Sequence, residues 1–178
     1  MIGVLGVSAV AAGVWGGCQS SPNVIDPYLA GPRAAQGKVP RPVDLLLPQN
    51  IRIHPFTTLQ TLEGRDVMGI EAHMEALDAF GDPTKAFGDV RFELYEFQAN
   101  SPDNKGKRLN VWLVGIGDAA NNMVHWDRVT RSYLFKLELT SQVKLGKTSG
   151  PAERYVLVAV FASPYTQRLF AEHVMSVR

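Results

Sequence analysis

Apolar and polar side chains alternate along the stretch Gly69-Ile70-Glu71-Ala72-His73-Met74-Glu75-Ala76-Leu77. Every second side chain from Ile70 to Ala76 is apolar, and the three between them are charged or polar. Successive side chains of an extended chain point to opposite faces, so this pattern indicates a strand with one buried and one solvated face. We therefore predict a β-strand over 69–77.

Six further segments resemble strands, because they alternate in the same way or form short apolar runs: 51–54, 90–95, 109–114, 133–139, 155–162 and 169–177. Turn-forming residues separate them at 81–83, 101–104, 118–122, 146–151 and 163–164. The run 155–162 is apolar on both faces, which is typical of a central strand covered on two sides. The sequence thus predicts about seven strands.

No segment carries apolar residues at helical spacing over the length that a crossover helix needs, so parallel strands are not expected. We predict an all-β fold, a two-layer and mainly antiparallel β-sandwich, with a closed barrel as the main alternative. The expected core consists of Phe92, Leu94, Val111, Leu113, Phe135, Leu137, Leu157 and Phe161. Trp126 is expected to close the bottom of the sandwich, and a short helix is expected around 123–129 or 165–170.

The 178 residues include 18 basic and 17 acidic side chains, a net charge of +1. Such a balance without a basic cluster argues against a nucleic-acid partner, which needs a concentrated cationic face. The single cysteine, Cys18, excludes an internal disulfide framework and a multi-cysteine metal site.

The first charged residue is Asp26, and residues 2–17 are uncharged and mainly apolar. As a helix they would span about 24 Å, less than a bilayer requires, so the core of a secretory signal fits better than a membrane span. A buried N-terminal helix is the alternative, although glycines make a poor helix interior.

Cys18 follows Trp15-Gly16-Gly17 at the end of this apolar stretch. The arrangement resembles the lipobox of bacterial lipoproteins, in which small residues precede a cysteine that becomes the acylated mature N-terminus. Trp15 departs from the Leu-like residue usual there, and no basic residue lies upstream. The resemblance implies a signal peptide and cleavage site over 1–18 and a lipid anchor on Cys18. Gln19, in place of Asp, implies sorting to the outer membrane. The alternative is a reduced, buried cysteine.

Six of the eleven prolines fall between Gln19 and Pro48. Proline lacks the backbone donor that helices and sheets need, so we interpret 19–48 as a tether and 49–178 as the sandwich domain. A flexible chain of this length spans roughly 30 Å, which would hold the domain away from a membrane. Within the tether, 43–47 could instead dock on the domain as a first strand.

The segment 76–83 with Gly88-Asp89-Val90-Arg91-Phe92 resembles a hairpin of bacterial immunoglobulin-like surface domains of the invasin and intimin type. Gly81 would allow a positive φ and Pro83 would fix the chain after it. Together with 90–95, the same run is similar to the early strands of the transthyretin-like lipoprotein of type VI secretion systems. Both resemblances imply a sandwich, and the second also implies the anchored layout.

No hydrolase, phosphate-binding or zinc-protease motif is present, and we expect neither an enzyme nor a cofactor. Three sets of residues were considered as sites. His73 and His173 could be neighbours across a sheet and hold a metal; Asp78, Asp82 and Asp89 could bind calcium; Glu71, Glu75 and Glu93 could supply a catalytic carboxylate pair. Surface histidines, turn caps and solvent-facing strand acids explain these residues better, so no metal site is predicted.

Tyr95, Phe97 and Trp112 fall on the face opposite the expected core positions of their strands. They could form an exposed apolar patch that binds a partner, or a second layer could cover them. We expect a lipid-anchored, non-catalytic protein of the bacterial cell envelope, on the outer membrane and facing the periplasm, that binds a protein partner or supports envelope assembly. A carbohydrate-binding module of a surface polysaccharide system is the alternative, because aromatic rings stack on sugars.

Overall fold

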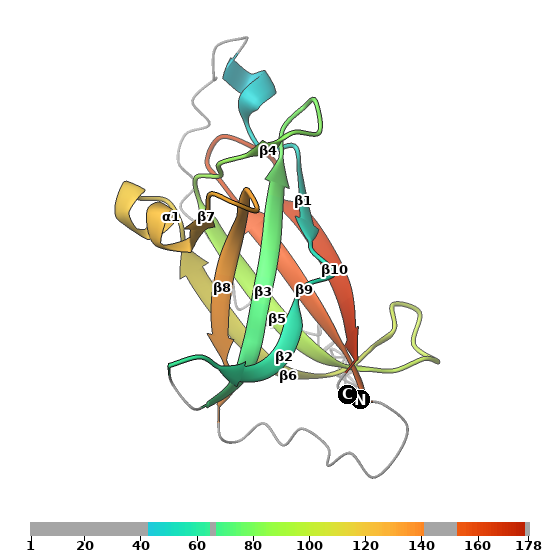
Figure 1. The fold of residues 1–178 in the computed structure, drawn as a ribbon. Coiled ribbons are helices and arrows are strands. Elements are labelled where there is room, and N and C mark those ends of the chain that lie inside the picture. Colours follow the sequence, from blue (N-terminus) through green and yellow to red (C-terminus); the bar gives the residue numbers. More distant parts are fainter. Residues whose placement is uncertain (1–42, 65–66, 141–152, 177–178) are drawn as a thin grey trace, which may run out of the picture. The chain divides into compact units, whose positions relative to one another are not determined.

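The computed structural model describes residues 43–64, 67–140 and 153–176, all of which belong to one compact unit. They form ten strands in two antiparallel sheets, which pack face to face as a sandwich (Figure 1). The predicted all-β sandwich is therefore confirmed, and the two sheets remain separate rather than closing into a barrel.

Sheet A contains six strands in an arrangement centred on β3. They are β1 (Asn50–Ile53), β2 (Thr58–Leu62), β3 (Val67–Leu77), β4 (Pro83–Thr84), β7 (Trp126–Asp127) and β8 (Ser132–Glu138). β3 pairs with β8 along one side, while β1 and β2 pair with successive halves of its other side. The alternating stretch from Gly69 to Leu77 thus lies in the central strand of the larger sheet.

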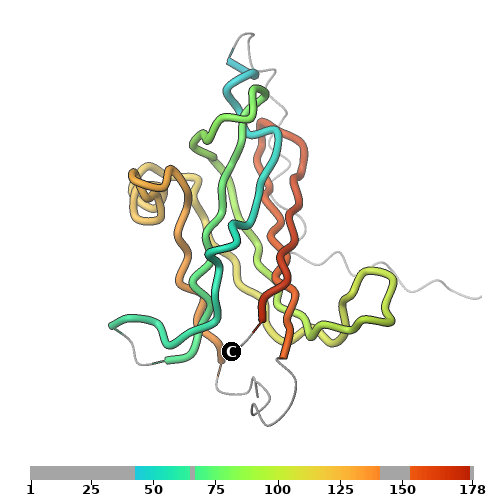
Figure 2. The backbone as a smooth tube through the Cα atoms, turned by 45° about the vertical axis from the view of Figure 1, so that its right-hand side comes forward, coloured from blue at the N-terminus to red at the C-terminus, as the bar shows by residue number. Residues whose placement is uncertain are grey.

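Sheet B contains four strands in the order β10-β9-β5-β6. Their bounds are β10 (Leu169–Ser176), β9 (Arg154–Ala162), β5 (Asp89–Phe97) and β6 (Lys105–Gly115). At one side of the sandwich, β10 lies beside β1 of sheet A (Figure 2). At the other side, β6 forms the second edge of sheet B.

All seven predicted strands are present, and the three additional ones are β2, β4 and β7. β4 and β7 contain two residues each, too few to show a period of two. β2 is mostly exposed, with Leu62 as its one buried residue, so it lacks the apolar face that marks the other strands.

The core lies between the sheets and is built from alternate side chains of their long strands. Phe92 of β5 and Phe135 of β8 meet at 5.0 Å between ring centroids, which joins the two layers. Six of the eight predicted core residues are buried: Phe92, Leu94, Phe135, Leu137, Leu157 and Phe161. The prediction was wrong for Val111 and Leu113, whose residues are 39% and 53% exposed.

The error in β6 has a simple cause in the strand register. Trp112 lies directly opposite Phe92, and opposed residues of an antiparallel pair share a face. Trp112 therefore points to the core, and its neighbours Val111 and Leu113 point outward. Both faces of this strand are apolar in the sequence, so alternation alone could not distinguish them.

The first described residues form a 3-10 helix, η1 (Val43–Leu46), and not the strand considered for 43–47. The backbone N–H of Ala79 donates to the carbonyl of Leu45, and the Thr84 hydroxyl donates to the carbonyl of Leu46, both at 3.1 Å. The last part of the predicted tether therefore contacts the sandwich.

A single α-helix, α1 (Ala119–His125), occurs in the described part of the chain and overlaps the first of the two predicted positions. Asp118 caps it by accepting a hydrogen bond from the Asn121 backbone N–H at 2.9 Å. The other position, 165–170, ends in strand β10. No helix among these residues has the length and apolar character needed to cross a membrane.

The expected role of Gly81 is confirmed, since it adopts a φ of +85° in the turn between β3 and β4. The turn is closed by the Asp82 carbonyl, which accepts from the Asp78 N–H. Trp126, on β7 at the edge of sheet A, packs against the core beside Tyr133, with 5.0 Å between ring centroids.

Tyr133 carries a buried hydroxyl that is fully engaged. It accepts from the Ala86 backbone N–H at 2.8 Å and lies 3.1 Å from the Asn122 side-chain oxygen, to which it donates. We predict that Tyr133→Phe lowers the free energy of unfolding by about 1–3 kcal/mol, because the Ala86 N–H loses its partner in a buried site. Urea denaturation measures this, and Tyr165→Phe at an exposed ring is the control. Equal effects of both variants would contradict the prediction.

Gly88 precedes β5 with a φ of +155°, and a Cβ there would lie 2.1 Å from the carbonyl oxygen of Ala162. At Gly81, also at positive φ, a Cβ would meet nothing within 4 Å. We predict that Gly88→Ala costs at least about 3 kcal/mol of stability, against about 1 kcal/mol for Gly81→Ala, since only the first adds a backbone clash. Chemical denaturation measures the free energy of unfolding of both variants. The loss in Gly81→Ala reports backbone strain alone, and the additional loss in Gly88→Ala reports the steric clash.

Candidate functional site

The outward side of sheet B, here called the outer face, is unusually apolar. Opposed residues line up in three cross-strand rows: Phe170–Val160–Arg91–Leu113, Glu172–Val158–Glu93–Val111 and Val174–Val156–Tyr95–Arg108. The two edge strands contribute four exposed apolar residues, Phe170 (60%), Leu113 (53%), Val174 (45%) and Val111 (39%). A solvated sheet face is usually polar, so these residues need an explanation.

Polar groups occur in the middle of this face as a cluster around Glu93. Its carboxylate lies 2.7 Å from Nε of Arg91 and 3.9 Å from Nη1 of Arg108, and it accepts a hydrogen bond from the Tyr95 hydroxyl. The side chains of Arg91 and Glu93 are only 14% and 13% exposed. Burial, and secondly the Glu93 carboxylate, raise the pKa of Tyr95, so its hydroxyl stays protonated at neutral pH.

The end of the outer face near the β5–β6 turn carries two further charged contacts. The Arg154 guanidinium lies 3.7 Å from the ring centroid of Phe97, a cation–π contact. Lys105 pairs with Glu172 of β10. Glu93 and Glu172 thus compensate Arg91 and Lys105, and the exposed Arg108 and Arg154 give this part of the face a positive character.

The three aromatic residues selected from the sequence do not share one face. Tyr95 and Phe97 belong to the outer face, whereas Trp112 points inward and packs against the core. The Trp112 indole N–H donates to the Glu138 carbonyl at 2.6 Å and links β6 to the end of β8. The three residues therefore do not form the expected aromatic patch. The exposed apolar residues of the outer face are aliphatic apart from Phe170, and two of them, Val111 and Leu113, were predicted in the core.

Cys18 and the rest of residues 1–42 lie outside the described residues, so the structure does not bear on the expected lipid anchor.

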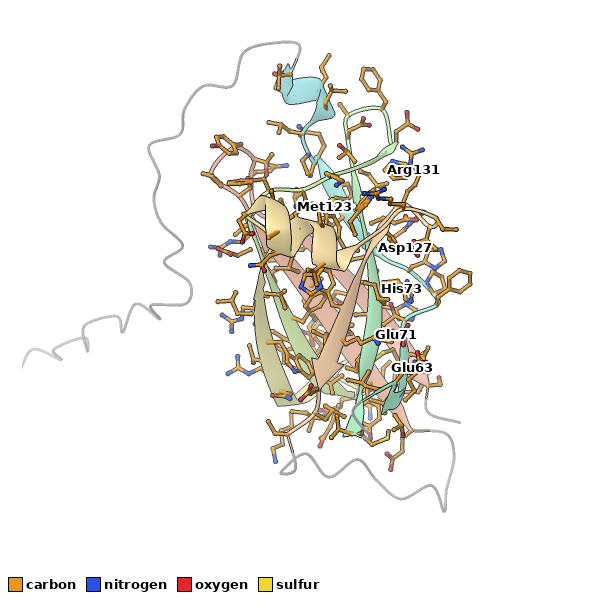
Figure 3. All side chains as sticks on the ribbon, turned by 60° about the vertical axis from the view of Figure 1, so that its left-hand side comes forward. Glu63, Glu71, His73, Met123, Asp127 and Arg131 are labelled. Carbon is orange, nitrogen blue, oxygen red and sulfur yellow. The ribbon has the colours of Figure 1, made fainter. Side chains whose placement is uncertain are left out.

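The considered carboxylate pair is divided between the two sheets. Glu71 and Glu75 lie on the outward side of β3, and Glu93 lies on the outer face of sheet B. Nε of Arg52 donates to Glu75 at 2.9 Å, and the Gln60 amide donates to Glu71 at 2.5 Å. Figure 3 shows Glu71 and His73 along the outward side of sheet A. These acids form contacts with side chains of neighbouring strands, as expected for solvent-facing strand acids.

The other two considered sites are also dispersed. His73 belongs to β3 and His173 to β10, so they lie in different sheets. Oδ1 of Asp78 accepts from the backbone N–H groups of Phe80 and Asp82, at 2.9 and 3.0 Å, and thus caps the turn. Over 43–64, 67–140 and 153–176, no group of three His, Cys, Asp or Glu side chains could hold a metal ion.

The His173 imidazole of β10 is partly buried. It occupies an inward position of β10, opposite Leu157, and burial lowers its pKa, with a smaller contribution from the charge of His54. Sequence alternation places His173 on β10, but its proximity to His54 follows only from the packing of β1 beside β10.

We predict that His173 makes the fold less stable as the pH decreases. Because the folded state holds this imidazole neutral, the unfolded chain binds a proton first, and stability falls as the pH passes below about 6.5. His173→Gln should flatten this dependence in urea denaturation between pH 7.5 and 5, whereas His54→Gln should retain most of it. An unchanged slope in His173→Gln would contradict the assignment.

Comparison of the chain with protein-family models, with curated proteins and with solved structures gave no match. Its function is therefore inferred from its own residues.

Proposed function

We propose that this chain is a lipid-anchored, non-catalytic binding protein of the bacterial cell envelope, and that it docks a protein partner on the outer face of sheet B. The anchor would be an acylated Cys18 at the outer membrane, with the domain facing the periplasm. The mechanism is tethered recognition: the lipid fixes the location, and the proline-rich segment sets the reach.

The observation that carries this proposal is the composition of the outer face. Its exposed apolar residues belong to the two edge strands, and the buried Val156 and Val158 and the Glu93 cluster lie between them. Exposed apolar patches rimmed by polar residues commonly mark protein interaction sites. Docking would remove these four side chains from water and contribute favourably by the hydrophobic effect.

The charges of the face indicate which partner chemistry fits. Glu93 pairs with Arg91 and accepts from the Tyr95 hydroxyl, so opposite charges offset each other at the centre of the face. Arg108, with its side chain 52% exposed and 3.9 Å from Glu93, and the exposed Arg154, over the Phe97 ring, supply the positive charge that would face carboxylates of a partner. We therefore expect an apolar protein surface with acidic residues at its rim.

The aromatic residues make a glycan a poorer fit. The indole of Trp112 is directed toward the core and is hydrogen-bonded to Glu138, and Phe97 has the Arg154 guanidinium over its ring. Sugar binding by stacking needs accessible ring faces, which aliphatic Val and Leu side chains do not supply. A protein partner is consistent with both observations.

The docking test uses a photo-crosslinking residue at Val174, on the outer face, in the full-length chain in its native host. We expect an adduct with another protein that falls at least about fivefold in Phe170→Asp and in Arg154→Glu, because these remove apolar area and a rim charge. Lys136→Asp, on the outward side of sheet A, is the matched control and should leave the adduct unchanged. The captured protein, once purified, should bind Phe170→Asp and Arg154→Glu more weakly than the wild-type chain, and Lys136→Asp as tightly.

An equal adduct from a probe at Lys136, or equal effects of the two sets of variants, would refute docking on the outer face. Cosedimentation of the purified chain with cell-wall polysaccharide, abolished by Phe97→Ala on the outer face and unaffected by Phe170→Asp, would favour the carbohydrate-binding alternative instead.

The anchor has a separate test, the intact mass of the chain extracted from membranes. We expect a mature chain that begins at Cys18 and carries acyl groups, and Cys18→Ala should release the protein from the membrane fraction. An unmodified chain that retains residues 1–17 would refute the anchor without affecting the docking result.

A further inference from the structure

Strand β6 has a free edge along its entire length in the described structure. It pairs with β5 on one side, and no described strand pairs with its other side. The opposite edge of sheet B differs, because β10 lies beside β1 of the other sheet. An eleven-residue edge is long, and natural proteins usually protect such edges against pairing with other chains.

The first half of β6 is protected in two ways. It contains the basic residues Lys105, Lys107 and Arg108. Its pairing with β5 is also interrupted by register shifts, between Leu94 and Tyr95 and between Tyr95 and Phe97. Charged side chains and bulges are devices that discourage an added strand.

The second half, Asn110–Gly115, has neither device. Its six residues pair in unbroken register with β5, from Asn110 opposite Leu94 to Gly115 opposite Asp89. It contains no charged residue and no proline. An uncharged and largely apolar edge in unbroken register is well suited to accept another strand.

The hydrogen-bond pattern shows which backbone groups of β6 face away from β5. The Ile116 N–H donates to the Gly88 carbonyl at 2.8 Å, so this end of the ladder is fixed. Hydrogen bonding alternates along an antiparallel pair, and the groups of Val111, Leu113 and Gly115 therefore point away from β5. Of these groups, the Val111 N–H donates to Oδ1 of its neighbour Asn110 at 2.9 Å. Val111 and Leu113 place their side chains on the outer face, where both are exposed.

The charges at the two ends of β6 have opposite signs. The end where the strand begins carries the exposed Lys107 and Arg108. The end where it finishes lies near two exposed acids: Asp89, opposite Gly115, and Asp118, three residues beyond the strand. An antiparallel neighbour with the same sequence would place each basic end beside an acidic end, whereas a parallel one would bring like charges together.

We propose that β6 pairs with β6 of a second copy of this chain, antiparallel about a two-fold axis near Trp112, so that the two four-stranded sheets form one continuous sheet. Val111 of each copy then lies opposite Leu113 of the other, and the backbone groups of both residues that point away from β5 become paired across the contact, with the Val111 N–H exchanging the Asn110 side-chain oxygen for a carbonyl of the second copy. The apolar rows of the two outer faces become continuous. A closed two-fold contact of this type uses one self-complementary surface and ends with the dimer.

The test is sedimentation equilibrium of the full-length chain, extracted in a density-matched detergent and measured over a range of concentrations. We expect a reversible dimer in the wild type. Leu113→Lys and Val111→Lys should each raise its dissociation constant about tenfold or more, since each places a charge in the paired edge. Val174→Lys is the matched control, because it adds the same charge on the outer face but at the β10 edge. Circular dichroism verifies that every variant retains the fold.

Lys107→Glu tests the charge argument and should weaken the dimer several-fold at low salt and less at high salt. A wild-type chain that is monomeric up to several hundred micromolar refutes the proposal, and so does a dimer that Val174→Lys disrupts and Leu113→Lys does not. A monomer that still forms the Val174 adduct with another protein would refute self-pairing and leave the docking function supported. A dimer that does not form the Val174 adduct with another protein would support self-pairing and refute the docking function.

Discussion

The register of β5 between β9 and β6 is the constraint on which the rest of the structure depends. It directs Phe92 and Leu94 into the core and Arg91 and Glu93 to the outer face. A shift by one residue would exchange these sets, burying a charged cluster and exposing the aromatic contact with sheet A. Sandwich packing, the ion pairs around Glu93 and the orientation of the β6 edge therefore all follow from one pattern of backbone hydrogen bonds.

Much of the fold could be predicted from the sequence, because strands with one buried face leave a period of two. All seven predicted strands exist, including the stretch from Gly69 that became the centre of sheet A. The prediction failed where this signal was weak. In β6 both faces are apolar, so the orientation of Val111 depends on its partner strand. The mainly apolar segment Val43–Leu46 forms a short helix instead of a strand. Its last two carbonyls accept hydrogen bonds from Ala79 and Thr84, which lie more than thirty residues away in the sequence.

The candidate site was harder to predict, because it is made of neighbours across strands and sheets. Tyr95 and Phe97 were selected correctly as outward residues, but Trp112 was assigned to the wrong face for the same reason as Val111. The position of Arg154 over Phe97 depends on β9, which is distant in sequence. A single sequence contains residue types and spacing, whereas the outer face depends on strand order, which only the folded chain supplies.

The inward indole of Trp112 has an optical consequence. The described residues contain two tryptophans: Trp112, bonded to the end of β8, and Trp126, which packs on Tyr133. Each lies on an edge strand of its sheet and packs against the core. Their ultraviolet emission therefore reports whether the two layers are still assembled, and a red shift would signal that water has entered between them.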